Sequence, residues 1–138
     1  MILEYVNAAR ADPAAMFDMF LDSVEPLRSP DERVDFALSF FDPDAFELAA
    51  QWSLLEPAPP LAWHDAPHDS AAAHNRLQIE FDEQSHLLPG EAPLSTRVRD
   101  AGYEKAVLIS ENVFSESLSV FFGHSAFVID RGNSPTGI

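Results

Sequence analysis

Eleven prolines, spread along a chain of 138 residues, set the strongest limit on how this sequence can fold. Proline has no backbone N–H and its ring clashes with the preceding helical turn, so it interrupts a helix or starts one. The helical spacing of apolar residues is accordingly confined to short stretches between prolines. The sequence therefore favours several short helices.

The spacing of apolar and capping residues predicts where these helices lie. The first begins at residue 2 and is broken before Pro13, and Ser29 is expected to cap the second, with Pro30 at its first position. Asp42 is expected to cap the third, and Gly102 is expected to follow the end of the fifth. The predicted helices are 2–22, 29–41, 42–55, 67–81, 94–103 and 115–130.

One segment has the alternation of a strand rather than the period of a helix. In residues 105–113, Val107, Ile109 and Glu111 alternate with Leu108 and Ser110, which predicts a β-strand. A single strand is not stable by itself, so further strands are expected, either short ones or ones beyond Ile138.

Composition excludes several classes of function. Hydrophobic residues make up 46% of the chain, which is enough for a folded core. Twenty-three acidic residues against eight basic ones give a net charge of −15, and such a surface repels nucleic acids and anionic lipids. No stretch approaches the roughly 18 apolar residues of a membrane span. With no cysteine, thiol catalysis and cysteine-based zinc sites are excluded.

A series of short motifs, in a fixed order, resembles the CAP superfamily of cysteine-rich secretory proteins, antigen 5 and plant pathogenesis-related 1 proteins, in its bacterial form. The motifs share that order with the family, although each alone is common. They are Asn7 and Arg10 in the first helix, Pro60-Leu61-Ala62-Trp63, Ser85-His86, Gly90, Arg97, Ala101-Gly102-Tyr103, Ser110-Glu111-Asn112-Val113 and Phe127-Val128-Ile129-Asp130.

This resemblance implies an α+β fold, the CAP-like α-β-α sandwich with a small antiparallel sheet between helices. Residues 1–138 would form a single CAP or SCP-like domain, in which residues 24–58 are a helical insertion. The chain is then expected to be truncated at its C-terminus and to lack the closing strands. The N-terminus has no signal-peptide pattern, so an extracellular, secreted location follows from the resemblance alone.

The resemblance also implies a metal site and structural motif residues. In the family, two histidines and two acids can hold a divalent ion such as zinc or calcium. Here His86, Glu111 and Asp130 match that set, while Asn7, Trp63 and Asn112 match structural positions. The family's second histidine follows the last helix in a Gly-His motif, and Gly123-His124 lies too early to match it. The chain departs from the family at Ser110, Phe127 and Asp130, where glycine, tryptophan and glutamate are usual.

Simpler interpretations of the same residues remain open. His86 could instead be a surface histidine at the end of a helix, and Glu111 could be an ordinary ion-paired acid. Asp130 could be a common helix-end aspartate. His124 is expected to be a satisfied core or groove histidine, and the pairs Phe40-Phe41 and Phe121-Phe122 are expected in the core.

Three functions fit these expectations. The first is a secreted module whose histidine and acid cleft binds a divalent metal, a small molecule, a lipid or a protein ligand. The second is a metal-dependent hydrolase of peptidase type, although no catalytic nucleophile is identifiable. The third is a structural or adhesive domain of a larger exported protein.

Overall fold

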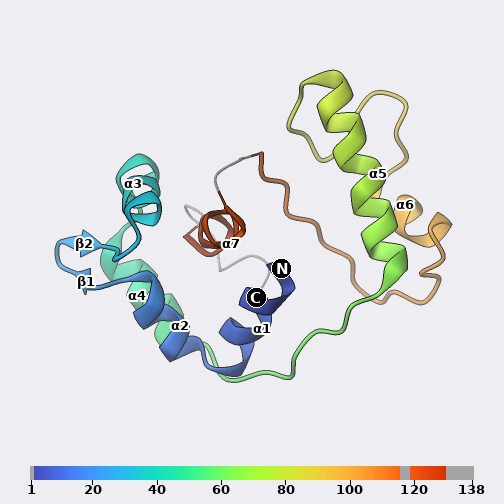
Figure 1. The fold of residues 1–138 in the computed structure, drawn as a ribbon. Coiled ribbons are helices and arrows are strands. Elements are labelled where there is room, and N and C mark those ends of the chain that lie inside the picture. The colour runs from blue at the N-terminus through green and yellow to red at the C-terminus, as the bar shows by residue number, and fades with distance from the viewer. Residues whose placement is uncertain (1, 116–118, 130–138) are drawn as a thin grey trace. The chain divides into compact units, whose positions relative to one another are not determined.

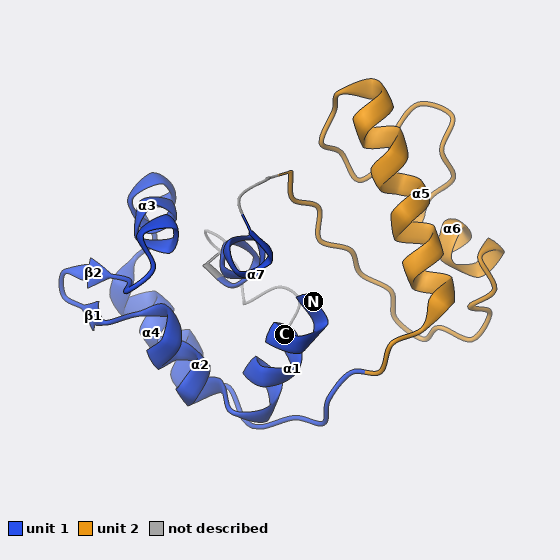
Figure 2. Ribbon diagram, in the orientation of Figure 1, with its two compact units in different colours: residues 1–61, 116–138 blue, residues 62–115 orange. Residues whose placement is uncertain are grey.

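The computed structural model describes residues 2–115 and 119–129 (Figure 1). Within these ranges the fold is of mixed α+β type, with seven helices and a two-stranded antiparallel sheet. The chain divides into two compact units (Figure 2). Unit 1 comprises residues 1–61 and 116–138, and unit 2 comprises residues 62–115.

Unit 1 is built from short helices, as the proline spacing predicts, together with a β-hairpin. The hairpin pairs Ser23 with Arg28 and Val24 with Leu27, and Glu25-Pro26 forms its turn. Its elements are α1 (Ile2–Ala11), α2 (Pro13–Phe20), β1 (Ser23–Val24), β2 (Leu27–Arg28), α3 (Glu32–Phe41), α4 (Ala45–Ser53) and α7 (Val120–Ile129).

Two of the predicted helix caps in unit 1 lie at other residues. Asp12 caps α2 by accepting from the Ala15 N–H, and the break before Pro13 is confirmed. Asp31, rather than Ser29, caps α3. Asp44, rather than Asp42, caps α4. Pro30 and Pro43 each precede an aspartate whose carboxylate reaches the next turn's N–H groups, so the cap falls after the proline.

The core of unit 1 is apolar and aromatic. Side chains from all five helices meet there, and Trp52 lies against the rings of Phe17 and Phe20. Its buried members are Ala9, Met16, Phe20, Leu21, Val34, Leu38, Leu48, Trp52 and Val128. Residues 24–58 contribute Val34, Leu38, Leu48 and Trp52 to this core, so they are part of the unit's packing.

Unit 2 consists of α5 (Asp65–Phe81), α6 (Leu94–Asp100) and the segments around them. Helix α6 ends as predicted. Gly102 has φ +106°, its N–H donates to Arg99 O, and the Tyr103 N–H donates to Val98 O. This is a Schellman motif, which needs a left-handed residue at the position of Gly102.

One prediction for unit 2 is wrong. Residues 105–113 form no strand, because no other strand of the described chain lies beside them to complete the hydrogen bonds. The buried face of α5 consists of Ala66, Ser70 and His74, while the apolar residues Ala73 and Phe81 are exposed. The face with the small and polar residues is buried because His74 finds polar partners inside the unit, described below.

None of the helices within the described ranges has the length and apolar character needed to cross a membrane.

Candidate functional site

Asn7 in α1 fixes the extended segment that contains Pro60 and Leu61. Its side-chain amide donates to Leu61 O (3.0 Å) and accepts from the Leu61 N–H (2.7 Å). One turn later, Arg10 Nε donates to Pro59 O at 2.8 Å, and Arg10 O accepts from the Ala58 N–H. Two motifs that lie 54 residues apart in sequence are thus joined by reciprocal hydrogen bonds within unit 1.

His86 and Glu111 come together in unit 2. The His86 Nδ1 lies 3.2 Å from Glu111 Oε1, and the imidazole is 68% exposed. Arg97, from α6, donates from Nη2 to both carboxylate oxygens of Glu111, at 3.0 and 3.1 Å, and to His86 O at 3.4 Å. The guanidinium therefore holds the carboxylate from inside the unit, while His86 meets it at the surface.

A second ion pair lies beneath this contact. The buried His74 has Nδ1 at 2.7 and 2.9 Å from the two oxygens of Glu91, and Nε2 at 2.9 Å from Ser85 O. A carboxylate and a backbone carbonyl can only accept hydrogen bonds, so both ring nitrogens must donate. The geometry is therefore that of an imidazolium ion paired with a carboxylate.

Arg97 connects the two pairs. Its Nε lies 3.4 Å from Glu91 Oε1, close enough for an ion pair although the N–H makes no hydrogen bond there. The result is a continuous row of polar contacts through His74, Glu91, Arg97, Glu111 and His86, which we call the ionic network of unit 2. Since unit 2 buries few large apolar residues, this ionic network is a major part of its interior.

Glu91 is ionised within this row. Burial raises the pKa of its carboxyl group, but the hydrogen bond from His74, the hydrogen bond from the Leu88 N–H and the charge of Arg97 together lower the pKa below its ordinary value. A buried, ionised carboxylate requires cationic neighbours, so the members of the ionic network depend on one another.

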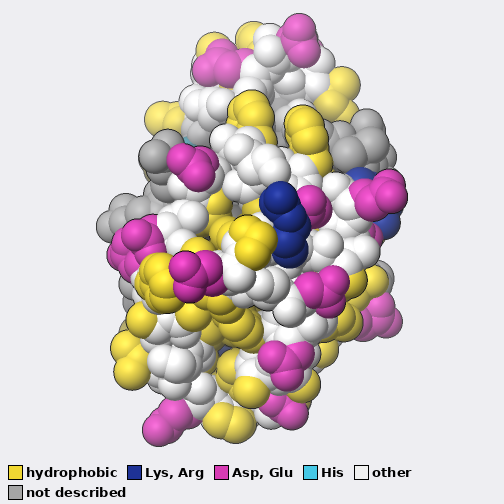
Figure 3. Space-filling view, turned by 90° about the vertical axis from the view of Figure 1, so that its left-hand side faces the viewer, with side chains coloured by type: hydrophobic (Ala, Val, Ile, Leu, Met, Phe, Trp, Pro, Cys, Tyr) yellow, Lys and Arg dark blue, Asp and Glu magenta, His cyan; other side chains and the backbone are white. Residues whose placement is uncertain are grey.

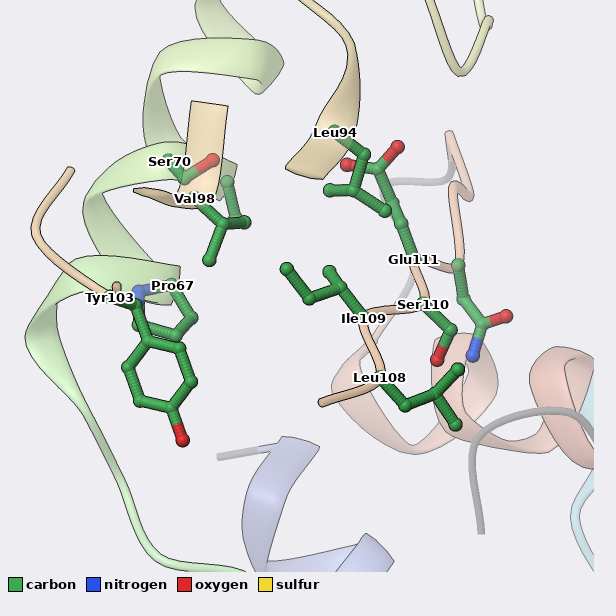
Figure 4. A pocket seen from close by; sticks show the side chains of 11 residues that line it. Pro67, Ser70, Leu94, Val98, Tyr103, Leu108, Ile109, Ser110 and Glu111 are labelled. Atoms are coloured by element: carbon green, nitrogen blue, oxygen red, sulfur yellow. The ribbon is translucent and has the colours of Figure 1, made fainter. Parts of the chain in front are cut away.

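An apolar groove opens beside Glu111 (Figure 4). It lies between α5, α6 and the extended residues 108–112, and has a volume of about 490 Å³. The side chain of Ile109 points toward Val98, and the Glu111 carboxylate lies beside Leu94 at one end. A groove of this size matches the pockets that hold small ligands.

The predicted motif residues Trp63 and Asn112 both lie in unit 2. Trp63 is half exposed, donates from Nε1 to Asp65 Oδ1 and contacts the ring of His68. Asn112 lines the groove. His64 caps α5 by accepting from the Ala66 N–H.

His124 lies in the core, as predicted, but lacks the predicted hydrogen bonds to the residues that the structure describes. It is only 1% exposed and lies against the rings of Tyr5 and Phe20, as a core histidine would. However, neither ring nitrogen has a hydrogen-bond partner within the described chain, so the residue is not satisfied as predicted. Burial lowers its pKa to about 4, which keeps the ring neutral.

Two of the three predicted metal ligands lie among the described residues. His86 and Glu111 are in contact, and Asp130 lies outside the described residues. Over residues 2–115 and 119–129, no group of three histidine, aspartate or glutamate side chains is arranged to hold a metal ion. The metal site therefore stays a prediction.

Sequence reasoning did not find His74 and Glu91. The signal for His74 was the spacing of the small residues Ala66 and Ser70, which continues to His74 at the same interval and marks a close-packed helix face. Glu91, in a loop between prolines, gave no such signal, because its role depends on the fold of the loop around it.

Comparison of the chain with protein-family models, with curated proteins and with solved structures found no significant match.

Proposed function

We propose that this chain is a CAP-like, extracellular ligand-binding module, in which the groove beside Glu111 holds a small amphipathic molecule. The observation that carries the proposal is the contact of His86 with Glu111, 25 residues apart, at the end of an apolar groove. The reciprocal bonds of Asn7 and Leu61 support the same family assignment. We also propose that the chain has the α-β-α sandwich fold of that family.

The chemistry of the groove indicates the class of ligand. Leu94, Val98 and Ile109 offer an apolar wall, while Glu111 and Asn112 offer polar groups at one end. A carboxylate in a chain with a net charge of −15 disfavours anionic headgroups. A long-chain alcohol or a sterol, whose neutral hydroxyl can donate to Glu111, fits this combination best.

Binding of a fluorescent sterol to the full chain tests the proposal. Ala71 and Ala73 are exposed neighbours on α5, but only Ala71 lines the groove. Ala71→Trp should fill the groove and weaken binding by about tenfold or more, while Ala73→Trp should leave it unchanged. Unlabelled long-chain alcohol should displace the probe more readily than the corresponding fatty acid. Equal affinities in the two variants would remove the groove from the proposal, and no binding at all would favour a structural or adhesive domain.

A divalent metal is a second candidate, favoured by the orientation of His86. Its Nδ1 faces Glu111, which leaves Nε2 at the exposed side of the ring. Metal-binding histidines commonly present one nitrogen to the ion while a carboxylate holds the other. His86 Nε2 would then be a ligand, with Glu111 in the outer shell because it faces the other ring nitrogen, and Asp130 would be the further expected donor. A bound zinc ion would supply Lewis-acid chemistry there.

Calorimetric titration of the full chain with Zn²⁺ and Ca²⁺ tests this candidate. Saturable binding that is lost in His86→Ala and retained in His68→Ala would support a metal at His86. Screens for hydrolase activity would then be justified. The absence of binding, or equal binding in both variants, would contradict it.

A further inference from the structure

Helix α3 of unit 1 has two apolar faces, and only one of them is covered. Val34, Ala37 and Leu38 are buried toward the unit's interior. Phe36 and Phe40, one turn apart on another side of the helix, are 67% and 72% exposed. The sequence predicts Phe40 in the core, which is wrong, because the core-facing positions of this helix are already filled by the buried three.

The exposed rings form one continuous surface. Phe36 and Phe40 stack with ring centroids 6.5 Å apart, and Phe41 meets Phe40 edge-on at 5.1 Å. We call these three residues the phenylalanine face. Large aromatic side chains gathered on a surface mark interaction sites in soluble proteins, since leaving them in water is unfavourable. Figure 3 shows the side of unit 1 that carries this helix, with hydrophobic side chains lying among acidic ones.

The helix that presents this face is held firmly in place. At its start, Asp31 accepts from the Arg33 and Val34 N–H groups, and Asp35 accepts from the Ser29 N–H. Its end is closed by Asp42 in a left-handed conformation, whose N–H donates to Leu38 O. Pre-ordered aromatic anchors lose little conformational entropy on binding, as a docking surface requires.

The charges beside the phenylalanine face are acidic. Glu32 lies one turn before Phe36, and Asp42 and Asp44 follow the end of the helix; all three are exposed. Arg33 does not balance them, because it is already paired with Asp31 at 2.8 Å. The surface is therefore an aromatic centre with a negative border.

From this combination we infer that the phenylalanine face docks a cationic amphipathic helix of a partner protein. The spacing of Phe36 and Phe40 by one helical turn suits the groove between ridges of a second helix. Basic residues at the edge of that helix would meet Glu32 and Asp42. A second copy of this chain, with its charge of −15, would be repelled, as would nucleic acids and anionic membranes. This inference concerns unit 1 and does not depend on the groove of unit 2.

Fluorescence anisotropy with a labelled synthetic helix tests the inference on the full chain. The probe is an amphipathic peptide of leucine and lysine, about 18 residues long so that it can be helical. Its counterpart carries glutamate in place of lysine. We expect saturable binding of the lysine peptide that weakens with added salt, and no binding of the glutamate peptide. Phe36→Ser with Phe40→Ser should weaken binding by at least about tenfold.

Two matched controls separate docking from general attraction. Ile79→Ser alters an equally exposed apolar residue of unit 2 and should leave the affinity unchanged. The pair Glu32→Gln and Asp42→Asn should weaken binding several-fold, whereas Glu80→Gln with Glu104→Gln, which changes the net charge equally in unit 2, should not.

Three results would overturn the docking of a cationic helix on the phenylalanine face. Binding that survives the double phenylalanine substitution, or that is equal for both peptides, would overturn the inference. Circular dichroism must show that the double variant keeps its helices, which is expected because both rings are exposed. Concentration-dependent dimerisation in analytical ultracentrifugation that disappears in the double variant would also overturn it, since the face would then serve a second copy.

Discussion

Replacing Arg97 with methionine tests whether the ionic network stabilises the fold of unit 2. The side chain of Arg97 is 7% exposed and contacts the carboxylates of both Glu91 and Glu111. Methionine keeps most of its length but removes the charge. Two carboxylates, one of them deeply buried, would then remain, with His74, His86 and the Leu88 N–H as their partners.

The expected loss of stability follows from these contacts. Removing one partner of a buried ion pair costs about 3–5 kcal/mol. Because Glu111 is partly exposed and Glu91 keeps His74 and the Leu88 N–H, the lower figure of about 3 kcal/mol applies here. A unit of this size has a total unfolding free energy of roughly 3–8 kcal/mol, so the substitution should leave unit 2 marginally stable.

Hydrogen exchange read by mass spectrometry locates the effect, alongside urea unfolding followed by circular dichroism. In Arg97→Met, amides of α5 and α6 should lose protection while those of α1, α2 and α4 keep it. Arg97→Lys, which keeps the charge but not the planar fork, should fall between. Arg99, 59% exposed and on the same helix, supplies the control, and Arg99→Met should cost at most about 0.5 kcal/mol. Unchanged protection of α5 in Arg97→Met would refute the reasoning.

Three further outcomes are expected. Asn7→Ala should lower the unfolding free energy of unit 1 by about 1–3 kcal/mol in urea unfolding, since both hydrogen bonds to Leu61 are lost. His124 has a folded pKa lowered from 6.5 to about 4, so the unfolded chain binds its proton first; unit 1 should lose up to about 3 kcal/mol as the pH falls from 6.5 to 4. Gly102→Ala should cost about 1 kcal/mol in thermal unfolding, because φ is +106° although space for a methyl group is open.

Each of these three outcomes has its own control. Asn75→Ala, on the exposed surface of α5, should change little, and an equal loss there would contradict the role of Asn7. His124→Leu should flatten the pH profile between 6.5 and 4; a profile that keeps its slope would assign the titration to other groups. Gly90→Ala, also at positive φ, should cost a similar amount to Gly102→Ala, so a much larger cost at Gly102 would indicate contacts beyond backbone strain.

The ionised carboxylate of Glu91 should make the stability of unit 2 decrease at low pH. Its folded pKa lies below the ordinary value of 4.5, so its contribution to stability is fully present above that pH and is lost as the pH falls through the folded pKa. Hydrogen exchange of α5 below pH 4.5 measures this loss. Glu91→Gln should abolish that part of the pH dependence, and a profile unchanged by the substitution would contradict the ion pair.

The sequence alone determined the local architecture. The prolines at positions 13, 30 and 43 divide unit 1 into short helices, because a missing N–H and a fixed φ act within one turn. The ending of α6 at Gly102 was likewise predictable, since only a residue that tolerates positive φ completes that motif. Polar caps were expected at Ser29 and Asp42, and both caps lie two residues later, at Asp31 and Asp44, because each follows the proline.

Only the tertiary structure decided which side chains meet. Residues 105–113 alternate like a strand, yet a strand exists only when another lies beside it, and the sequence cannot show that partner. The contact of His86 with Glu111 was expected from a resemblance, but Arg97 joined the same network from helix α6 and Glu91 joined it from a loop. The exposure of Phe40 was also decided there, because burial depends on which face of a helix its neighbours cover, and periodicity does not show where those neighbours lie.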